Sequence, residues 1–213
     1  MSGIIISTFP GMTKRYINGK VCKYINLNSH DFHWTKNQDG EKVDNLDFPE
    51  NYINCILENL EKQDIIFVPL VDMKILDDAG LRYLLMYPSK SIKTDWLNDI
   101  RSWVVSDSAK MFVDELDKNW NKIIKDIENI YTSNCIKIEI LNSFVQLESI
   151  IDNCFDTLKQ IINMPEIYSG FNTKFSVSFP SNNISMVDIS NASTNIDARG
   201  INYSGGLAHL IGN

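Results

Sequence analysis

The sequence has 213 residues, and its 20 lysines and arginines are outnumbered by 27 aspartates and glutamates, for a formal net charge of −7. This balance disfavours broad nonspecific binding to nucleic acids or to anionic membranes, while a hydrophobic fraction of 44% allows a sizeable core. We find no signal peptide and no apolar stretch of membrane-spanning length, and the four cysteines are widely spaced, so we expect a cytoplasmic protein that does not bind membranes.

Short apolar stretches alternate with helical patterns along most of the chain. The apolar stretches predict five strands, at residues 3–7, 21–27, 64–68, 84–87 and 135–141. Helical periodicity predicts a short helix ending at Gly19, a helix that begins near Asp47, and helices at residues 72–79, 93–103, 108–130 and 145–162. The polar residues 36–45 predict a loop. Strands that alternate with helices indicate an α/β fold, with a parallel sheet of about five strands flanked by helices.

The helix before the third predicted strand begins at a capping signal. Asp47 stands three residues before Glu50, which is the spacing of a capping box, and Pro49 is tolerated in a first helical turn. We therefore expect the Asp47 side chain to cap this helix.

The loop after the first strand has features of a phosphate-binding loop. Phe9, Pro10 and Gly11 predict a turn at the end of the strand, and Lys14 follows at the position of a phosphate-binding lysine. Ligands of parallel sheets bind at the carboxyl ends of the strands, where this loop would lie. The loop is a candidate phosphate site.

Five stretches, in this order, resemble the landmarks of a family of small phage and bacterial P-loop proteins of the nucleotide (adenylate-type) kinase kind. In one-letter code they are FPGMTKR (9–15), NLNSHDFHW (26–34), LDFPENYI (46–53), DIIFV (64–68) and YPS (87–89). The family typically has F-P-G-x-G-K-S, D-S-D-S-S-x-F-x-W, P-D-F-P-x-N-Y-I, D-x-I-F-V and Y-P-S at these places. The resemblance implies the P-loop NTPase fold of a nucleotide kinase, in a domain of residues 1–165.

The resemblance implies a site for ATP and Mg²⁺ after the first strand. Gly11, Thr13, Lys14 and Arg15 would bind the cofactor's phosphates, since they occupy the family's phosphate loop. Lys14 and Arg101 would be the catalytic residues, with Arg101 matching a basic position at the end of a helix. No metal-ligating residue is assigned.

The resemblance also places residues at a site for the substrate nucleotide. Asn26 and Asn28 match the polar positions after the second strand, and Asn51 with Tyr52 matches the helix over the acceptor nucleotide. Lys93 belongs to the segment whose basic residues clamp the transferred phosphate.

The departures from the family fall on the residues that carry the chemistry. Thr8 and Thr13 stand at the two glycine positions of the phosphate loop, and Arg15 stands where a Ser or Thr hydroxyl would hold Mg²⁺. Asn26 and Asn28 stand at two aspartate positions, and an amide does not supply a carboxylate's charge to a metal ion. Phosphoryl transfer depends on positioning and on the metal. We therefore expect transfer to be weak or lost.

Three functions follow from these patterns. The first is a degenerate nucleotide-kinase-like protein, phage-encoded and acting in the host cytoplasm, that keeps at most phosphate or nucleotide binding and works mainly by binding. The second is an active nucleoside or nucleotide monophosphate kinase with a divergent loop. The third is a structural or assembly protein that uses a C-terminal arm.

The C-terminal segment, residues 166–213, differs in composition from the rest of the chain. From residue 171 onward it is rich in Ser, Asn and Gly and has few charges, and Phe175, Val177 and Phe179 alternate with small polar residues. The alternation predicts an extended strand. The segment either folds over the main domain or serves as an arm for a protein partner or for self-association.

Two histidines after the second strand form the other candidate cluster. His30, Asp31 and His33 lie within four residues, but a fourth ligand at a familiar spacing is missing, so we do not assign a metal site. We expect both histidines at the rim of a cleft, with Phe32 and Trp34 packing inward.

Overall fold

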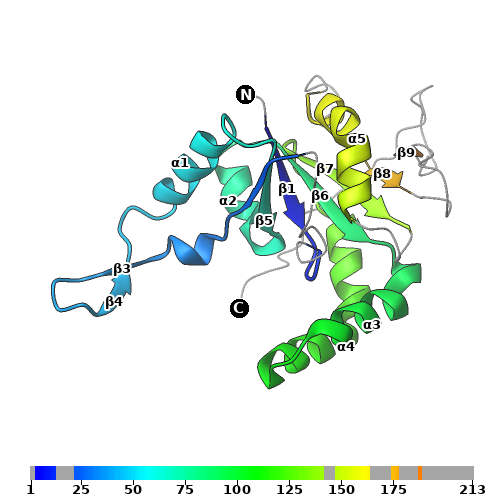
Figure 1. The fold of residues 1–213 in the computed structure, drawn as a ribbon, viewed down its shortest axis with the longest axis horizontal. Helices are drawn as coiled ribbons and strands as arrows, with labels where there is room; N and C mark the ends of the chain where they lie inside the picture. The colour runs from blue at the N-terminus through cyan, green and yellow to red at the C-terminus, as the bar shows by residue number, and fades with distance from the viewer. Residues whose placement is uncertain (1–2, 13–21, 142–146, 164–173, 178–186, 189–213) are drawn as a thin grey trace.

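The computed structural model describes residues 3–12, 22–141, 147–163, 174–177 and 187–188, which form an α/β fold around a parallel sheet (Figure 1). Five parallel strands lie side by side in the order β2 (Tyr24–Asn26), β5 (Ile65–Pro69), β1 (Ile4–Thr8), β6 (Tyr83–Pro88) and β7 (Cys135–Ile140). They correspond to the five predicted strands. The prediction of an α/β fold with a five-stranded parallel sheet is confirmed.

The C-terminal segment contributes two further strands to this sheet. β8 (Lys174–Val177) pairs parallel with β7, and β9 (Val187–Asp188) pairs antiparallel with β8 at the edge. These parts of the segment therefore extend the sheet of the main domain. The rest of residues 166–213 lies outside the described residues, as does the short helix predicted to end at Gly19.

The other predicted helices are present with similar bounds. They are α1 (Glu50–Asn59), α2 (Met73–Asp78), α3 (Lys93–Trp103), α4 (Asp107–Glu128) and α5 (Leu147–Ile162), with short 3-10 turns η2 (Ser29–Asp31), η3 (Leu70–Asp72) and η4 (Lys90–Ile92). Within the described part of the chain, none of the helices combines the length and the hydropathy needed to cross a bilayer.

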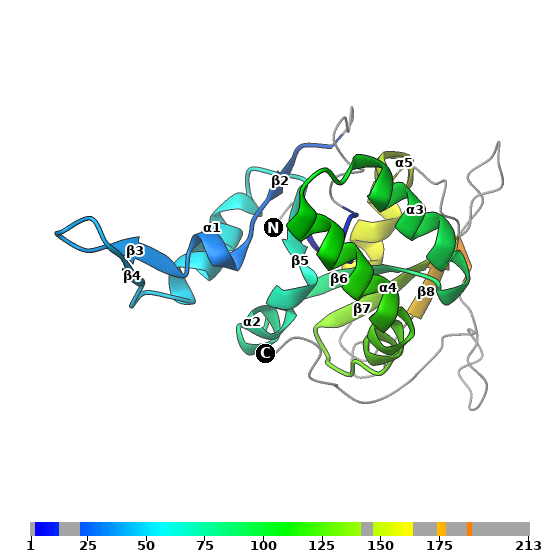
Figure 2. The ribbon, with the colours of Figure 1, turned by 90° about the horizontal axis from the view of Figure 1, so that it is seen from below.

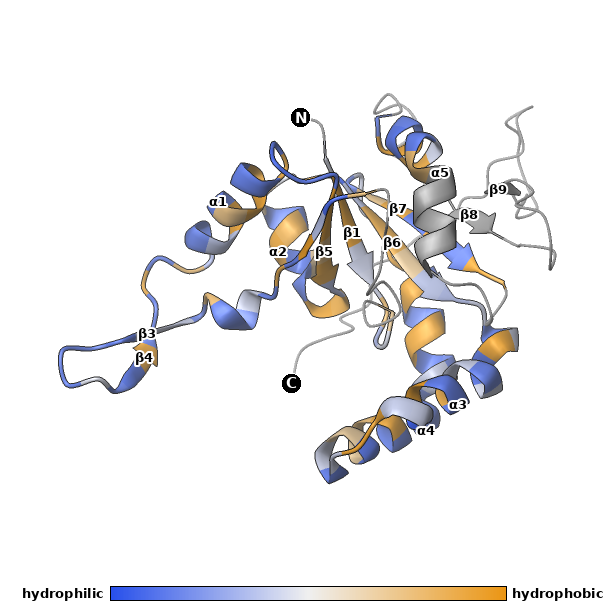
Figure 3. Cartoon of the chain, in the orientation of Figure 1, coloured by the Kyte–Doolittle hydropathy of each residue, from blue (hydrophilic) through white to orange (hydrophobic). Residues whose placement is uncertain are grey.

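Both faces of the sheet are covered. Every residue of β1, β6 and β7 is buried, as expected for parallel strands packed on both sides. The two views place α5 over one face and α2 with α4 over the other (Figures 1 and 2). Figure 3 shows apolar residues along the central strands, most strongly on β5, and both apolar and polar residues on α4. The buried residues of α4 are Val113, Leu116, Trp120, Ile124 and Ile127. This spacing is typical of a helix that buries one side against a sheet.

The predicted loop at residues 36–45 is wrong in part. β3 (Trp34–Lys36) and β4 (Lys42–Asp44) form an antiparallel hairpin that extends away from the sheet (Figure 1). All six strand residues are exposed, so the hairpin has no buried face to impose an alternation of apolar and polar residues. Gly40, with φ of 80°, lies in its turn.

The predicted side-chain cap of α1 is also wrong. Pro49 occupies the N-cap position, and no side chain caps the helix. The Asn45 carbonyl group accepts a hydrogen bond from the Phe48 N–H at 3.1 Å, so a turn stands where the capping box was expected. Asp47 contributes its backbone carbonyl, which accepts a hydrogen bond from the Asn51 N–H at 2.9 Å.

Candidate functional site

The connections between the strands run in opposite directions on the two sides of β1. The chain leaves β1 toward β2 on one side of the sheet, whereas it leaves β5 toward β6 and β6 toward β7 in the opposite direction. Connections that diverge from neighbouring parallel strands leave a crevice at the carboxyl ends of those strands. The order of the strands therefore singles out the end of β1 as the place for a ligand.

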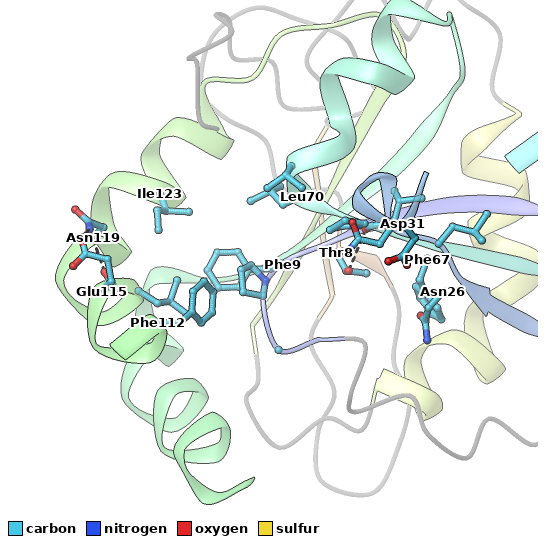
Figure 4. Close-up of a pocket in the computed structure, with 18 residues that line it drawn as sticks. Thr8, Phe9, Asn26, Asp31, Phe67, Leu70, Phe112, Glu115, Asn119 and Ile123 are labelled. Carbon is cyan, nitrogen blue, oxygen red and sulfur yellow. Dashed lines mark hydrogen bonds between the residues drawn. The ribbon is translucent and has the colours of Figure 1, made fainter. Parts of the chain in front are cut away.

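A cavity of about 690 Å³ lies at this place (Figure 4). Its strand-end side is formed by residues at the ends of β1, β2 and β5, and its other side by α4. The described strand-end lining is Thr8, Phe9, Pro10, Gly11, Asn26, Leu27, Asn28, Asp31, Phe67, Val68, Pro69, Leu70 and Val71, and the α4 lining is Phe112, Glu115, Leu116, Asn119 and Ile123. The volume is within the range of small-molecule sites.

The loop after β1 is fixed against α3 and α4. The Phe9 ring makes edge contacts with Trp96 and Trp120, at centroid distances of 6.1 and 5.3 Å. The Trp96 indole N–H donates a hydrogen bond to the Pro10 carbonyl at 3.3 Å. The start of the loop is thus held in place by packing on these helices.

Gly11 has a conformation that only glycine adopts readily. Its φ is +87°, and a Cβ atom there would lie 2.7 Å from Ile100 Cδ1. Of the four predicted cofactor-binding residues, Gly11 lines the cavity. Thr13, Lys14 and Arg15 lie outside the described residues.

Asn26 and Asn28, predicted to bind substrate, both line the cavity and are exposed. Asn28 caps the η2 turn, because its Oδ1 accepts a hydrogen bond from the His30 N–H at 3.0 Å. Asp31, at the end of the same turn, also lines the cavity. Residues with amide and carboxylate side chains therefore line the cavity at the end of β2.

A buried carboxylate holds this turn. Asp72, 1% exposed, accepts hydrogen bonds from the Ser29 N–H at 3.1 Å, from the Ser29 hydroxyl and from the Tyr52 hydroxyl at 2.7 Å. Burial, followed by the neighbouring Asp72 charge, raises the pKa of Tyr52 above its ordinary value, so its hydroxyl remains a donor. This Asp72 cluster (Ser29, Tyr52 and Asp72) links η2, α1 and η3 behind the strand-end side of the cavity.

Asn51 and Tyr52 are not part of the described cavity lining. Tyr52 is fully buried and bonded to Asp72. Asn51 donates a hydrogen bond from Nδ2 to the Phe32 carbonyl at 3.0 Å, and its Oδ1 accepts one from the Tyr52 N–H. The structure thus shows both side chains engaged in contacts within the protein.

Lys93 and Arg101 form ion pairs between α3 and α4. Lys93 Nζ lies 2.7 Å from Asp117 Oδ1, and Arg101 Nη2 lies 2.8 Å from Asp117 Oδ2 and 3.5 Å from Asp114 Oδ1. The hydrogen bond to Asp117 raises the pKa of Arg101, and hydrogen bonds from Lys93 and Arg101 lower the pKa of Asp117. Neither cation belongs to the described cavity lining.

The sequence did not point to the residues of α4 that line the cavity. Phe112, Leu116, Asn119 and Ile123 follow helical spacing, and Glu115 accepts a hydrogen bond from the Asn119 amide group. Their one signal was an aromatic residue on the polar side of an amphipathic helix: Phe112 is 53% exposed. Single exposed apolar residues are common on protein surfaces, so this signal did not identify a site.

The histidine cluster does not lie as expected. Trp34 does not pack inward, because it is 36% exposed and lies under Lys42 Nζ, 4.5 Å from the ring centroid. Phe32 does pack inward, against Tyr52 at 5.1 Å. His30 and His33 are outside the described cavity lining, and the described residues contain no group of three or more side chains placed to bind a metal ion.

Comparisons with known proteins do not identify the chain: no family model matches it, and neither a curated protein nor a solved structure was found to be significantly similar.

Proposed function

We propose that the chain is a degenerate P-loop nucleotide-kinase-like protein that binds a nucleotide by its phosphate groups and has weak or no phosphoryl transfer. The observation that carries the proposal is the place of Gly11. This glycine lines the cavity at the end of β1 with φ of +87°, and Lys14 and Arg15 follow within four residues. A glycine in this conformation lets backbone N–H groups turn toward an anion, and the two cations would add charge.

The strand order supports a ligand at this place. Parallel sheets bind ligands where their connections diverge, and the chain diverges at β1. The cavity extends from Gly11 along the ends of β2 and β5 to α4, which leaves room for more than a phosphate group.

The residues that the resemblance assigns to phosphoryl transfer are poorly suited to catalyse it. Asn26 and Asn28 offer amides where carboxylates would attract Mg²⁺. Arg101 and Lys93 are engaged with Asp117, so they would have to leave these ion pairs to reach a transferred phosphate. Positioning and charge neutralisation are nearly all of phosphoryl-transfer catalysis.

A thermal-shift experiment tests the proposal. The purified chain is scanned with ATP and GTP, with and without Mg²⁺, beside the variant Lys14→Ala and the control Lys74→Ala, an exposed lysine of α2. We expect nucleotide to raise the Tm of the wild type and of the control but not of Lys14→Ala, because a ligand stabilises the state that binds it. A Tm that no nucleotide changes would refute the proposal, and Mg²⁺-dependent consumption of ATP would show an active kinase instead.

A further inference from the structure

The cavity presents carboxylate groups on both of its sides. Asp31 belongs to the strand-end side and Glu115 to α4, and both residues are exposed. Figure 4 shows Asp31 beside Thr8 and Asn26, with Glu115 and Asn119 on the opposite wall. A carboxylate accepts hydrogen bonds from hydroxyl groups and repels a phosphate group. The two groups therefore favour a ligand that carries hydroxyls and no negative charge at this part of the cavity.

The amide groups of the cavity can recognise the edge of a ring. Asn28 uses its carbonyl oxygen for the His30 N–H, so its NH₂ group is the part that a ligand can use. Asn119 donates its NH₂ group to Glu115, which leaves its carbonyl oxygen as an acceptor. Asn26 is exposed at the end of β2, and its side chain offers both an NH₂ donor and a carbonyl acceptor. Donors and acceptors together suit the mixed polar edge of a heterocyclic base.

Apolar side chains on α4 provide a surface for a flat ring. Phe112 and Ile123 extend from α4 on the side facing Leu70 and Phe9 (Figure 4), and Leu116 lies between them along the helix. Phe112 is 53% exposed, so a stacked ring would remove apolar surface from water.

We infer that the part of the cavity between Asp31 and α4 takes an uncharged nucleoside, in preference to the same nucleoside's 5′-monophosphate. Its base would stack on Phe112 and its hydroxyls would be accepted by Asp31 and Glu115. The inference rests on the proposed function, in which a separate nucleotide binds by its phosphates near Gly11. It adds a second ligand and names the chemical class of that ligand.

The test is calorimetric titration of the full chain with adenosine, guanosine, cytidine and thymidine, and with their 5′-monophosphates. We expect at least one nucleoside to bind about tenfold more tightly than its monophosphate, because the phosphate meets two carboxylates. The double variant Asp31→Asn, Glu115→Gln should reduce this ratio toward one. The control Glu61→Gln, an exposed carboxylate outside the described lining, should leave the ratio unchanged.

A second pair of variants tests the stacking surface. Phe112→Ala should weaken nucleoside binding about tenfold, which is the size of a lost base–aromatic stack. Met111→Ala, at the neighbouring exposed residue outside the described lining, should have no effect.

The outcomes separate this inference from the proposed function. Monophosphates that bind as tightly as nucleosides, or a ratio that the double variant does not change, would overturn the inference. ATP binding that depends on Lys14, without binding of any nucleoside, would overturn the inference but support the proposed function, in which the phosphate loop binds a nucleotide. Tighter binding of a nucleoside than of its monophosphate, without ATP binding, would support the nucleoside site and refute the proposed binding of a nucleotide by the phosphate loop.

Discussion

Each side of the cavity is stabilised by one carboxylate, and the two carboxylates differ in burial. Asp72, on the strand-end side, is 1% exposed and joins η2, α1 and η3. Asp117 joins α3 to α4, and its side chain is 36% exposed. A buried carboxylate with hydrogen-bonded partners is costly to disrupt, because the partners lose their acceptor away from water. An exposed ion pair competes with water and salt. We therefore expect the strand-end side to depend on its charge and the α3–α4 side to depend on packing.

The largest effect should come from Asp72→Ala. The change removes the acceptor of the Tyr52 hydroxyl and of two Ser29 donors, so we expect the free energy of unfolding to fall by about 3 kcal/mol. Urea denaturation measures the change, with Asp78→Ala, at an exposed aspartate of α2, as control. A loss below about 1 kcal/mol would show that the buried cluster is no stronger than a surface pair.

The next effect, Gly11→Ala, tests the packing of the loop on α3. Alanine at φ of +87° is strained, and its Cβ would lie 2.7 Å from Ile100 Cδ1, so we expect a loss of about 2 kcal/mol. Gly40→Ala is the matched control. It has φ of +80° with nothing within 4 Å of the added Cβ, and should cost about 1 kcal/mol, the backbone part alone. Equal losses in both variants would argue against contact between the loop and α3.

Tyr52→Phe should have a smaller effect on the buried side. It removes one donor and leaves Asp72 with its two bonds from Ser29, so we expect a loss of about 1.5 kcal/mol. Combined with Asp72→Ala, it should add little further loss, since both variants remove the same hydrogen bond. The double-mutant cycle measures this coupling, and full additivity would show that the two side chains do not interact.

The smallest effect concerns the exposed ion pairs. Arg101→Ala should lower the free energy of unfolding by less than about 1 kcal/mol, and less still at high salt. Hydrogen bonds from Lys93 and Arg101 hold the pKa of Asp117 below its ordinary value of 3.8. The stabilisation is therefore present above the unfolded-state pKa and is lost as the pH falls through the lower folded-state pKa.

Urea denaturation of Asp117→Asn and wild type, from neutral pH to below pH 3.8, measures this dependence. The difference between the two proteins should shrink as the pH falls. A difference that is constant with pH would show that the ion pairs do not stabilise the fold.

The sequence predicted the elements well because their patterns are local. The bounds of α3, residues 93–103, agree with the prediction, and the five strands were placed within a few residues. Gly11 was recognised as a turn residue, and its positive φ is consistent with that reading. The hairpin of β3 and β4 was missed, since strands exposed on all residues carry no apolar alternation.

The sequence by itself determined the five strands of the parallel sheet, the helices α1 to α5 and the turn at Gly11, because strand and helix periods and glycine turns depend on neighbouring residues. Only the tertiary structure brought Ser29 and Tyr52 to Asp72, across 43 and 20 positions of the chain. It also placed Phe112 and Glu115 of α4 opposite the ends of β1 and β2. These contacts follow from the order of the strands, which local sequence patterns do not encode, so the α4 side of the cavity became visible only in the fold.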